Sequence, residues 1–227
     1  RVAFINKMDR EGASFAASLE SMRKRLTSAS SSAQATQFLP LQLPVGQSSS
    51  FSGVVDLLDM SLLRWPDSDG AAAGGAADAA HAVTRHVLSA ADESGSGGGD
   101  EEAAALLPAA VQARERLVEQ IADLDDRVAD VYLAEGAASA RLTAPLLRAA
   151  VRAATLSMRA VPVLCGAAFR RKGVQPLMDA IVDYLPSPAE RKVTAYALGA
   201  LPAASASFSA ASSAGPVSAA SGGVPVV

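Results

Sequence analysis

The stretch that decides the expected fold is the first one, "RVAFINKMDR" (residues 1–10). Val2–Ile5 is a short, uninterrupted apolar run, which is typical of a parallel strand buried on both faces. From Gly12 onward, apolar residues recur at the spacing of an amphipathic helix, at Phe15, Leu19, Met22 and Leu26. A strand, a turn and a helix in this order form the repeating unit of an α/β sheet, so the stretch predicts an α/β domain.

The same unit recurs towards the C-terminal end. The run "AVPVLC" (residues 160–165) predicts a second buried strand, and the turn "GAAFRRKG" (residues 166–173) follows it. A strongly periodic helix comes next, with apolar residues at Val174, Leu177, Met178, Ile181, Val182 and Leu185. Pro186 and Pro188 are expected to end that helix, because proline cannot continue the helical hydrogen bonds.

The segment between the two units is of another kind. "FLPLQLPVG" (38–46) and "FSGVVDLLDMSLLRW" (51–65) combine strand formers with Gly and Pro, which predicts a small antiparallel sheet. One helix is expected along Leu117, Ile121, Leu124, Val128 and Val131, and another along Leu146, Leu147, Ala150, Val151, Ala154 and Met158. Thr143 is the expected N-cap of the second helix, with Pro145 in its first turn. A small α+β piece is therefore expected between two α/β units.

Low-complexity sequence separates these segments. Residues 67–105 and 199–223 are rich in Ala, Gly and Ser, and residues 27–36 form a short Ser/Ala tract. Half of the chain is apolar, but only 4% is aromatic and alanine supplies much of the apolar count. The two long stretches cannot bury enough large apolar surface to offset chain entropy, so they are predicted to be disordered or loosely ordered.

Composition excludes several classes of function. A net charge of −3 argues against broad binding of nucleic acid through phosphate contacts, and short basic runs at 23–25 and 170–172 are more often solvated faces. The single cysteine, Cys165, rules out an internal disulfide and is expected to be a small buried hydrophobe. His81 and His86 do not share a helical face, so metal binding by the two is not expected. The sequence shows neither the pattern of a signal peptide nor an apolar run of membrane-spanning length. The acidic residues Asp123, Asp125, Asp126 and Asp130 are expected on a solvated helix face.

Chemistry is expected where the first strand ends, because ligands of open α/β sheets bind at the carboxyl ends of the strands. Asn6, Lys7 and Asp9 form the pattern Asn-Lys-x-Asp directly after the strand. A carboxylate at Asp9 can accept hydrogen bonds from the ring N–H and the exocyclic amino group of guanine, which adenine cannot supply. Lys7 can lay its aliphatic stem over a base, and Asn6 can bond the base edge or tie neighbouring loops together. The alternative is a turn in which an Asp caps the next helix.

Three separated signatures then occur in the order found in one family. "NKMDR" (6–10), "FSGVVDL" (51–57) and "CGAAFRRKGVQPLMDAIVDYLPSP" (165–188) resemble translation elongation factor G, a translational GTPase, and the resemblance extends over about residues 1–190. It implies the C-terminal half of a P-loop GTPase G domain, an α/β fold, with an inserted α+β subdomain and disordered linkers. The implied boundaries are residues 1–38 and 159–190 for the G domain, 39–158 for the inserted subdomain, 191–223 for a linker and 224–227 for the start of a β-barrel domain.

The resemblance also assigns site residues. Asn6, Lys7 and Asp9 match the guanine-specificity motif, and Ala168 matches an alanine whose backbone N–H meets the guanine carbonyl oxygen. The family loop usually reads Ser-Ala-Phe, whereas this chain has Ala167, Ala168 and Phe169, so the hydroxyl that helps to brace the loop is missing and weaker base binding is expected. Arg170-Arg171-Lys172 replaces the usual Lys-Asn-Lys, a difference without a functional explanation at this point. No catalytic residue and no metal ligand is assigned.

Phosphate chemistry has no support in the sequence. The four lysines, at 7, 24, 172 and 192, never follow a glycine, so no phosphate-binding loop is present. Asp67–Gly70 and Asp92–Gly95 mimic the Asp-x-x-Gly element but lie in low-complexity sequence after the guanine motif. We therefore expect GTP or GDP as ligand, with the ligands of Mg²⁺ outside this sequence and negligible GTPase activity of these residues alone.

The resemblance implies a role on the ribosome for the complete form. That form is expected to hydrolyse GTP while it drives tRNA and mRNA movement, with rRNA and stalk proteins as partners, no membrane contact and a monomeric state. The stretch "LLRAAVRAATLSMRAVPV" (146–163) looks most like mitochondrial members, with chloroplast and cytoplasmic forms as alternatives. Two other functions remain open: a paralogue that splits ribosomes during recycling, and a non-catalytic module that binds the ribosome or another partner.

Overall fold

The computed structural model describes residues 1–27, 36–65, 83–88, 101–190, 193–194 and 207–208. It divides into two compact units, residues 1–185 and 186–227. The first unit contains, in chain order, β1 (Ala3–Ile5), α1 (Phe15–Thr27), β2 (Gln37–Pro40), β3 (Gln42–Val45), η1 (Ser48–Ser50), β4 (Gly53–Asp56), β5 (Ser61–Arg64), β6 (Thr84–Val87), α3 (Glu101–Ala122), α4 (Asp126–Glu135), α5 (Ala144–Leu156), β7 (Ala160–Cys165), η4 (Ala168–Arg170) and α6 (Val174–Tyr184).

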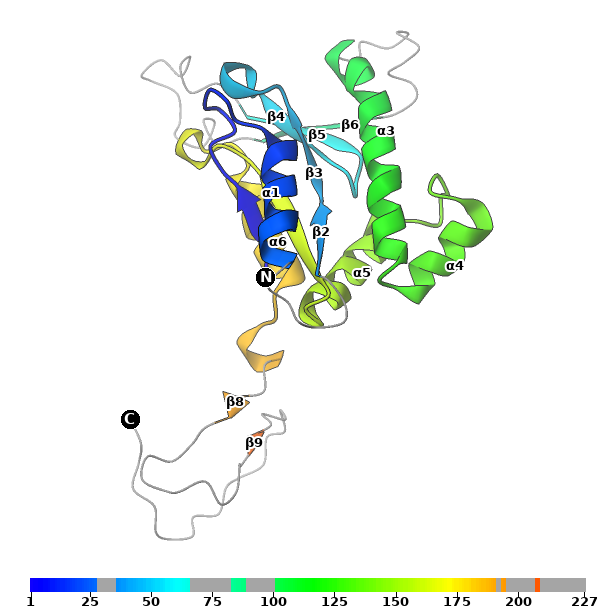
Figure 1. Ribbon diagram of the computed structural model, residues 1–227. Coiled ribbons are helices and arrows are strands. Elements are labelled where there is room, and N and C mark those ends of the chain that lie inside the picture. The colour runs from blue at the N-terminus through cyan, green and yellow to red at the C-terminus, as the bar shows by residue number, and fades with distance from the viewer. Residues whose placement is uncertain (28–35, 66–82, 89–100, 191–192, 195–206, 209–227) are drawn as a thin grey trace, which may run out of the picture. The chain divides into compact units, whose positions relative to one another are not determined.

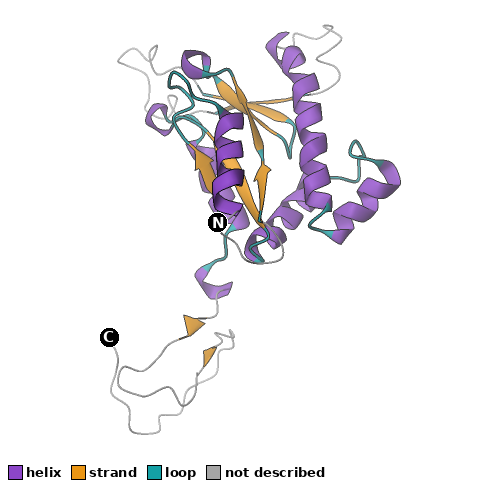
Figure 2. Ribbon diagram, in the orientation of Figure 1, coloured by secondary structure: helices purple, strands orange, loops and turns teal. Residues whose placement is uncertain are grey.

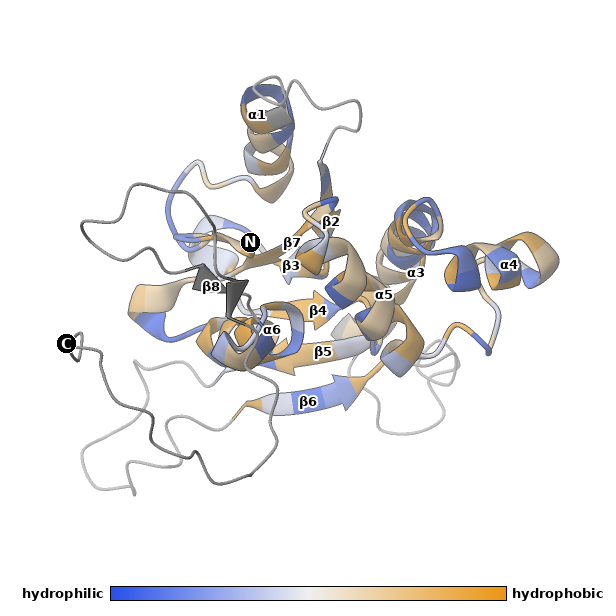
Figure 3. Cartoon of the chain, turned by 90° about the horizontal axis from the view of Figure 1, so that it is seen from below, coloured by the Kyte–Doolittle hydropathy of each residue, from blue (hydrophilic) through white to orange (hydrophobic). Residues whose placement is uncertain are grey.

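A parallel sheet forms the first layer, with strand order β1-β7-β2 (Figures 1 and 2). Phe4 pairs with Leu164, and Phe38 pairs with Val161, so the central strand is the late one, β7. Helix α1 covers one face, where its Leu19 packs in a cluster with strand residues of β2 and β7 (Figure 3). Helices α5 and α6 lie on the other face. Both predicted strands and both predicted helices of the α/β units are confirmed.

Two expectations about this sheet were wrong. β2 was predicted to belong to the antiparallel sheet, but Gln37–Pro40 pairs with β7 in parallel. An apolar run with prolines does not show which strand it will pair with. The chain passes from one sheet to the other at Leu41. The Leu41 N–H donates to the Val163 carbonyl, and the Leu41 carbonyl accepts from the Leu57 N–H. β1 was predicted to be buried on both faces, but Ala3–Ile5 is half-buried, and within the described residues it pairs with β7 alone.

The predicted antiparallel sheet is confirmed, with strand order β3-β4-β5-β6. Its fourth strand, Thr84–Val87, falls inside the stretch 67–105 that was predicted to be disordered. The strand is an exposed edge with polar residues, as Figure 3 shows, and edge strands carry such residues without loss of pairing. The average composition of the long stretch is dominated by Ala, Gly and Ser, so it does not indicate the four residues of this strand. Residues 67–82 and 89–100 of that stretch lie outside the described residues. They include His81 and both Asp-x-x-Gly mimics.

The helices of the inserted segment also differ from expectation. A single helix was predicted through Leu117 and Val131, but α3 ends at Ala122 and α4 begins at Asp126. The break occurs because the side chain of Asp125 caps α4 by accepting a hydrogen bond from the Arg127 N–H, at 3.0 Å. Helix α3 starts at residue 101, still within the stretch predicted to be disordered. Thr143 lies at the N-cap position of α5 as predicted, although its side chain forms no capping hydrogen bond.

One hydrophobic core joins the two sheets with helices α3, α4, α5 and α6 of the first unit. It includes Leu39 and Leu164 of the parallel sheet, Val55 of the antiparallel sheet, Leu117 of α3 and Leu147 of α5, all nearly inaccessible to solvent. In the second unit, β8 (Val193–Thr194) pairs antiparallel with β9 (Ser207–Phe208), so residues 207–208 form a strand where a disordered linker was predicted. No helix among the described residues is long and apolar enough to span a membrane.

Candidate functional site

The first loop of the site leaves the carboxyl end of β1. The Asn6 side chain accepts a hydrogen bond from the Lys7 N–H at 2.8 Å, and Lys7 adopts a left-handed backbone with φ of 62°. Met8 is almost fully buried and donates its N–H to the Gly166 carbonyl at 3.1 Å. Burial of Met8 anchors the loop, and the neighbouring side chains of Asn6 and Lys7 are left exposed while Asp9 is half-buried.

The second loop leaves the carboxyl end of β7, the strand next to β1. Ala167 and Lys172 form a short antiparallel bridge, with Ala167 N–H donating to the Lys172 carbonyl at 2.9 Å, and η4 lies between them. Gly166 is required there, because a Cβ atom would lie 2.4 Å from the Lys172 carbonyl oxygen. Gly173 closes the loop with φ of 85°, a conformation that favours glycine. The sequence "GAAFRRKG" thus forms a tight, closed turn.

The two loops meet at the edge of the parallel sheet. The Ala168 N–H donates to the Asn6 Oδ1 atom at 3.0 Å, and the Gly166 N–H donates to the Ile5 carbonyl at 3.0 Å. Arg170 and Asp9 form an ion pair, with 3.3 Å between Nε and Oδ2. Asn6 therefore ties the loops together, and the Ala168 N–H, which the resemblance assigns to a guanine carbonyl, is engaged by Asn6 in this structure.

The structure gathers the six predicted site residues but gives them different environments. Asn6, Lys7, Ala168 and Phe169 are exposed, and Phe169 at 98% exposure is free to contact a planar ligand. Ala167 is buried, in a small cluster with Met8, Phe51, Trp65 and Cys165. Its side chain therefore belongs to the core, and its contribution to a ligand site is limited to the backbone.

Three contacts with the inserted segment support the two loops and the start of α6, and sequence reasoning did not predict them. The buried Lys172 donates from Nζ to the Phe51 carbonyl at 3.2 Å. Trp65 donates from Nε1 to the Gln175 side-chain oxygen at 2.9 Å. The Ser48 N–H donates to the Met8 carbonyl at 3.1 Å. The available signal was rarity, since Trp65 is the only tryptophan and Lys172 is one of four lysines.

The two loops offer an acceptor and two exposed side chains. The Asp9 carboxylate can accept hydrogen bonds from two donors of a ligand, and the Lys7 side chain and the Phe169 ring are both exposed and able to contact a planar group. Among the described residues, no group of three or more His, Cys, Asp or Glu side chains is arranged to hold a metal ion. The Cys165 thiol is buried, which raises its pKa to about 12 and makes it a poor nucleophile.

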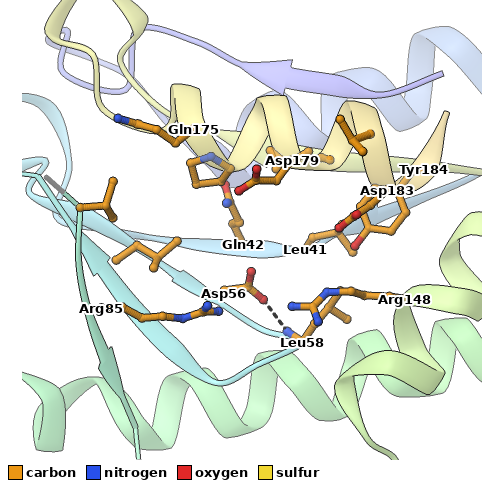
Figure 4. Close-up of a pocket in the computed structure, with 16 residues that line it drawn as sticks. Leu41, Gln42, Asp56, Leu58, Arg85, Arg148, Gln175, Asp179, Asp183 and Tyr184 are labelled. Carbon is orange, nitrogen blue, oxygen red and sulfur yellow. Dashed lines mark hydrogen bonds between the residues drawn. The ribbon is translucent and has the colours of Figure 1, made fainter. Parts of the chain in front are cut away.

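A separate cavity of about 480 Å³ lies between α6 and the antiparallel sheet (Figure 4). None of the six predicted residues lines it. Its two arginines, Arg85 and Arg148, both pair with the Asp59 carboxylate. Asp56 lies deep in its wall, and burial raises the pKa of that carboxyl above its usual value. The arginines are thus held by a protein carboxylate, and this cavity is distinct from the loop site.

Comparison with known proteins identifies the fold and the family. The family model for the elongation factor Tu GTP binding domain matches residues 1–187. The chain is 42% identical over 193 residues to "Ribosome-releasing factor 2, mitochondrial" of Rattus norvegicus, covering 85% of this chain and 21% of that protein. It is 38% identical over 192 residues to "Elongation factor G" of Neorickettsia sennetsu, covering 85% of this chain and 23% of that protein. The chain thus spans about a fifth of the length of these relatives.

A solved structure has the same fold. The crystal structure of ttk003000868 from Thermus thermophilus matches with a TM-score of 0.57 at 20% identity, over 86% of this chain and 24% of that one. Together with the parallel sheet and its inserted antiparallel sheet, these matches confirm the predicted resemblance. The chain belongs to the family of elongation factor Tu GTP binding domains, and within it to the elongation factor G type.

Proposed function

We propose that this chain supplies the guanine-recognition part of a GTP-binding translation factor. The observation that carries the proposal is the meeting of two loops at the carboxyl ends of the adjacent strands β1 and β7. The Asp9 carboxylate comes from one loop and the Ala168 N–H and Phe169 ring come from the other, so an acceptor, a donor and an exposed ring lie on the two loops that meet. Asn6 must release or share the Ala168 N–H when a base carbonyl binds.

Titration of the 227-residue chain with nucleotide monophosphates tests this role. GMP is expected to shift the backbone amide NMR signals of Lys7 and Ala168, and AMP is expected to leave them unchanged at the same concentration. The difference arises because adenine has an acceptor at N1 and no 2-amino group, and therefore meets the Asp9 carboxylate without a donor. Equal shifts of these signals with GMP and AMP would show that the chain does not recognise guanine.

Asp9→Asn is the matching variant. The amide can donate to one position and accept from another, so preference is expected to change from GMP towards XMP, which carries a carbonyl where guanine carries an amino group. The change in relative affinity is expected to be at least about tenfold, the usual consequence of one reversed hydrogen-bond match. Asp130→Asn, on an exposed part of α4, is the control for the loss of one negative charge. An unchanged GMP to XMP ratio in Asp9→Asn would take Asp9 out of the site.

For the complete protein, we propose GTP hydrolysis coupled to work on the ribosome, in mitochondria. Support comes from the family match and from relatives named as mitochondrial ribosome-releasing factor and as elongation factor G. GTP or GDP would bind through the residues named above, and a Mg²⁺ ion would accompany the nucleotide. On its own, the 227-residue chain is proposed to bind the base without hydrolysing GTP, because its sequence has no phosphate-binding loop.

A second role within the same family is favoured by one observation. Four relatives named as mitochondrial ribosome-releasing factor match at 38–42% identity, and these matches support ribosome release as the second proposed role of the complete protein. A chimaera of the rat factor that carries residues 1–187 of this chain should retain ribosome-dependent GTP hydrolysis and subunit release. A chimaera that folds and binds ribosomes but releases no subunits would argue against this second role.

A further inference from the structure

Asp9 has a charged partner that the sequence did not predict. Arg170 lies across the site from it, with 3.3 Å between Arg170 Nε and Asp9 Oδ2. The Asp9 side chain is 14% exposed and the Arg170 side chain is 45% exposed, so the carboxylate is the more enclosed of the two. Within the described part of the chain, no other side chain forms an ion pair with Asp9.

The loop holds Arg170 at a fixed place. Its N–H donates to the Ala167 carbonyl at 2.9 Å, at the end of η4. The bridge between Ala167 and Lys172 closes the loop around it, and the buried Lys172 side chain fastens that bridge to the Phe51 carbonyl. The guanidinium therefore reaches Asp9 from a rigid base, which reduces the entropy lost when the pair forms.

We propose that Arg170 is a positioning residue that sets guanine specificity by orienting the Asp9 carboxylate; this rests on the proposed guanine site. A guanine ring presents two donors to Asp9, and both are satisfied only when the two carboxylate oxygens lie in the plane of the base. Each carboxylate oxygen has two lone pairs, so Oδ2 can accept from guanine while it remains paired with Arg170. Oδ1 is left for the second donor.

The same contact explains how the loop is braced without a hydroxyl at position 167. Ala167 is buried and can form no side-chain hydrogen bond to Asp9. Arg170, three residues later on the same loop, supplies a link from this loop to that carboxylate. Two residues of Arg170-Arg171-Lys172, which had no functional explanation in the sequence, now have a role. Arg170 links the loop to Asp9, and Lys172 fastens the loop to the Phe51 carbonyl.

A specificity ratio separates orientation of Asp9 from general support of the fold. GMP and IMP differ only in the exocyclic amino group, which is one of the two donors that Asp9 accepts. A misoriented Asp9 carboxylate weakens the binding of GMP more than the binding of IMP, whereas a loosened fold weakens the binding of both nucleotides equally. The GMP to IMP affinity ratio therefore reports the orientation of Asp9.

The experiment is a titration of the ¹⁵N-labelled 227-residue chain with GMP and with IMP, followed by backbone amide shifts. Arg170→Gln is expected to lower the GMP to IMP affinity ratio about three- to tenfold, the effect of weakening one charge-assisted hydrogen bond. Arg170→Lys keeps the positive charge and is expected to recover most of the ratio. Arg171→Gln, which removes the adjacent arginine, is the matched control and is expected to keep the wild-type ratio. Added salt should lower the ratio in the wild type more than in Arg170→Gln, because the pair is partly exposed.

Three outcomes overturn the proposal, and they are distinguishable. If Arg170→Gln leaves the GMP to IMP affinity ratio unchanged, Arg170 does not contribute to specificity. If the variant binds GMP more tightly than the wild type, Arg170 competes with the base for Asp9. In both cases the proposed function stands if the wild type still prefers GMP over AMP and Asp9→Asn abolishes that preference. If the wild type does not distinguish GMP from AMP, both proposals are wrong.

Discussion

At the scale of single residues, the chain uses buried polar groups to support exposed ones. Lys172 and Gln42 are nearly inaccessible, and each bonds a backbone group: Lys172 donates to the Phe51 carbonyl and Gln42 accepts from the Cys165 N–H. Both contacts end at or beside the loop that follows β7. An unpaired polar group at such a position would cost about 1–3 kcal/mol, so these residues fix the loop conformation as well as contributing to stability.

Asp56 is a partly buried carboxyl whose protonation should affect stability. Its Oδ1 accepts from the Leu58 N–H at 2.9 Å, but burial raises its pKa in the folded state, and the nearby Asp59 charge adds to the effect. The folded state then holds the proton more tightly than the unfolded state does. The stability that this group contributes is fully present below the usual carboxyl pKa and is lost as pH rises through the raised value.

Asp56→Asn should therefore behave differently at low and neutral pH. The amide keeps an acceptor for the Leu58 N–H and carries no charge, so the variant is expected to gain in free energy of unfolding relative to wild type as pH rises from about 4 to about 7. Urea denaturation at several pH values measures the difference, and Asp130→Asn tests whether a change in net charge alone produces it. A difference between variant and wild type that does not change with pH would contradict the assignment.

At the scale of elements, caps and edges decide boundaries that periodicity does not reveal. The apolar spacing from Leu117 to Val131 fits a single helix, yet the capping side chain of Asp125 starts a new one. Strand β6 is another case, because four residues with ordinary strand propensity lie within a long Ala/Gly/Ser-rich stretch. In both places a local side-chain bond or a neighbouring strand determines the structure, and averaging over a window conceals it.

Asp125→Ala tests the cap of α4. The side chain accepts from the Arg127 N–H at 3.0 Å and pairs with the Arg127 guanidinium at 2.8 Å, and the hydrogen bond from that side chain lowers the pKa of Asp125. Loss of an N-cap typically lowers the free energy of unfolding by about 1 kcal/mol. The loss should be full at neutral pH and should shrink as pH falls through the lowered pKa of Asp125.

Urea denaturation of Asp125→Ala beside Asp130→Ala provides the measurement. Asp130 lies on the same helix, is exposed and occupies no capping position, so its replacement is expected to change the free energy of unfolding by less than about 0.5 kcal/mol. Equal losses in the two variants would show that the cap does not start α4.

At the scale of the whole first unit, the sequence predicted the layers better than the connections between them. The α/β units and the Asn-Lys-x-Asp loop follow from local patterns around Val2–Ile5 and residues 160–173, and the antiparallel sheet follows from residues 38–65. The contacts of Arg170 with Asp9 and of Trp65 with Gln175 could not be predicted, because they join residues 161 and 110 positions apart. Such pairs depend on how the sheets meet, which no local pattern contains.

These long-range contacts make the two loops of the proposed guanine site depend on the inserted segment. Phe51 and Trp65 of the inserted segment share a buried cluster with Met8 and Ala167 of the two loops. The larger core likewise runs from the parallel sheet into α3 and α5. Because a continuous apolar core joins the two sheets, the described part of residues 1–185 is expected to unfold as one cooperative unit.

Urea unfolding followed by two probes tests this cooperativity. Trp65 is the only tryptophan and is 7% exposed, so its fluorescence reports the contact between the inserted sheet and the loop after β7, whereas far-ultraviolet circular dichroism reports mainly the helices. The two transitions are expected to share one midpoint, with a slope at or above the upper end of the roughly 1–3 kcal/mol per molar range for small proteins. Lys172→Met, which removes the hydrogen bond to the Phe51 carbonyl, should lower both midpoints together. If Trp65 fluorescence changed at a lower urea concentration than the helices, the inserted sheet would detach first and the proposed guanine site would lose its support before the domain unfolds.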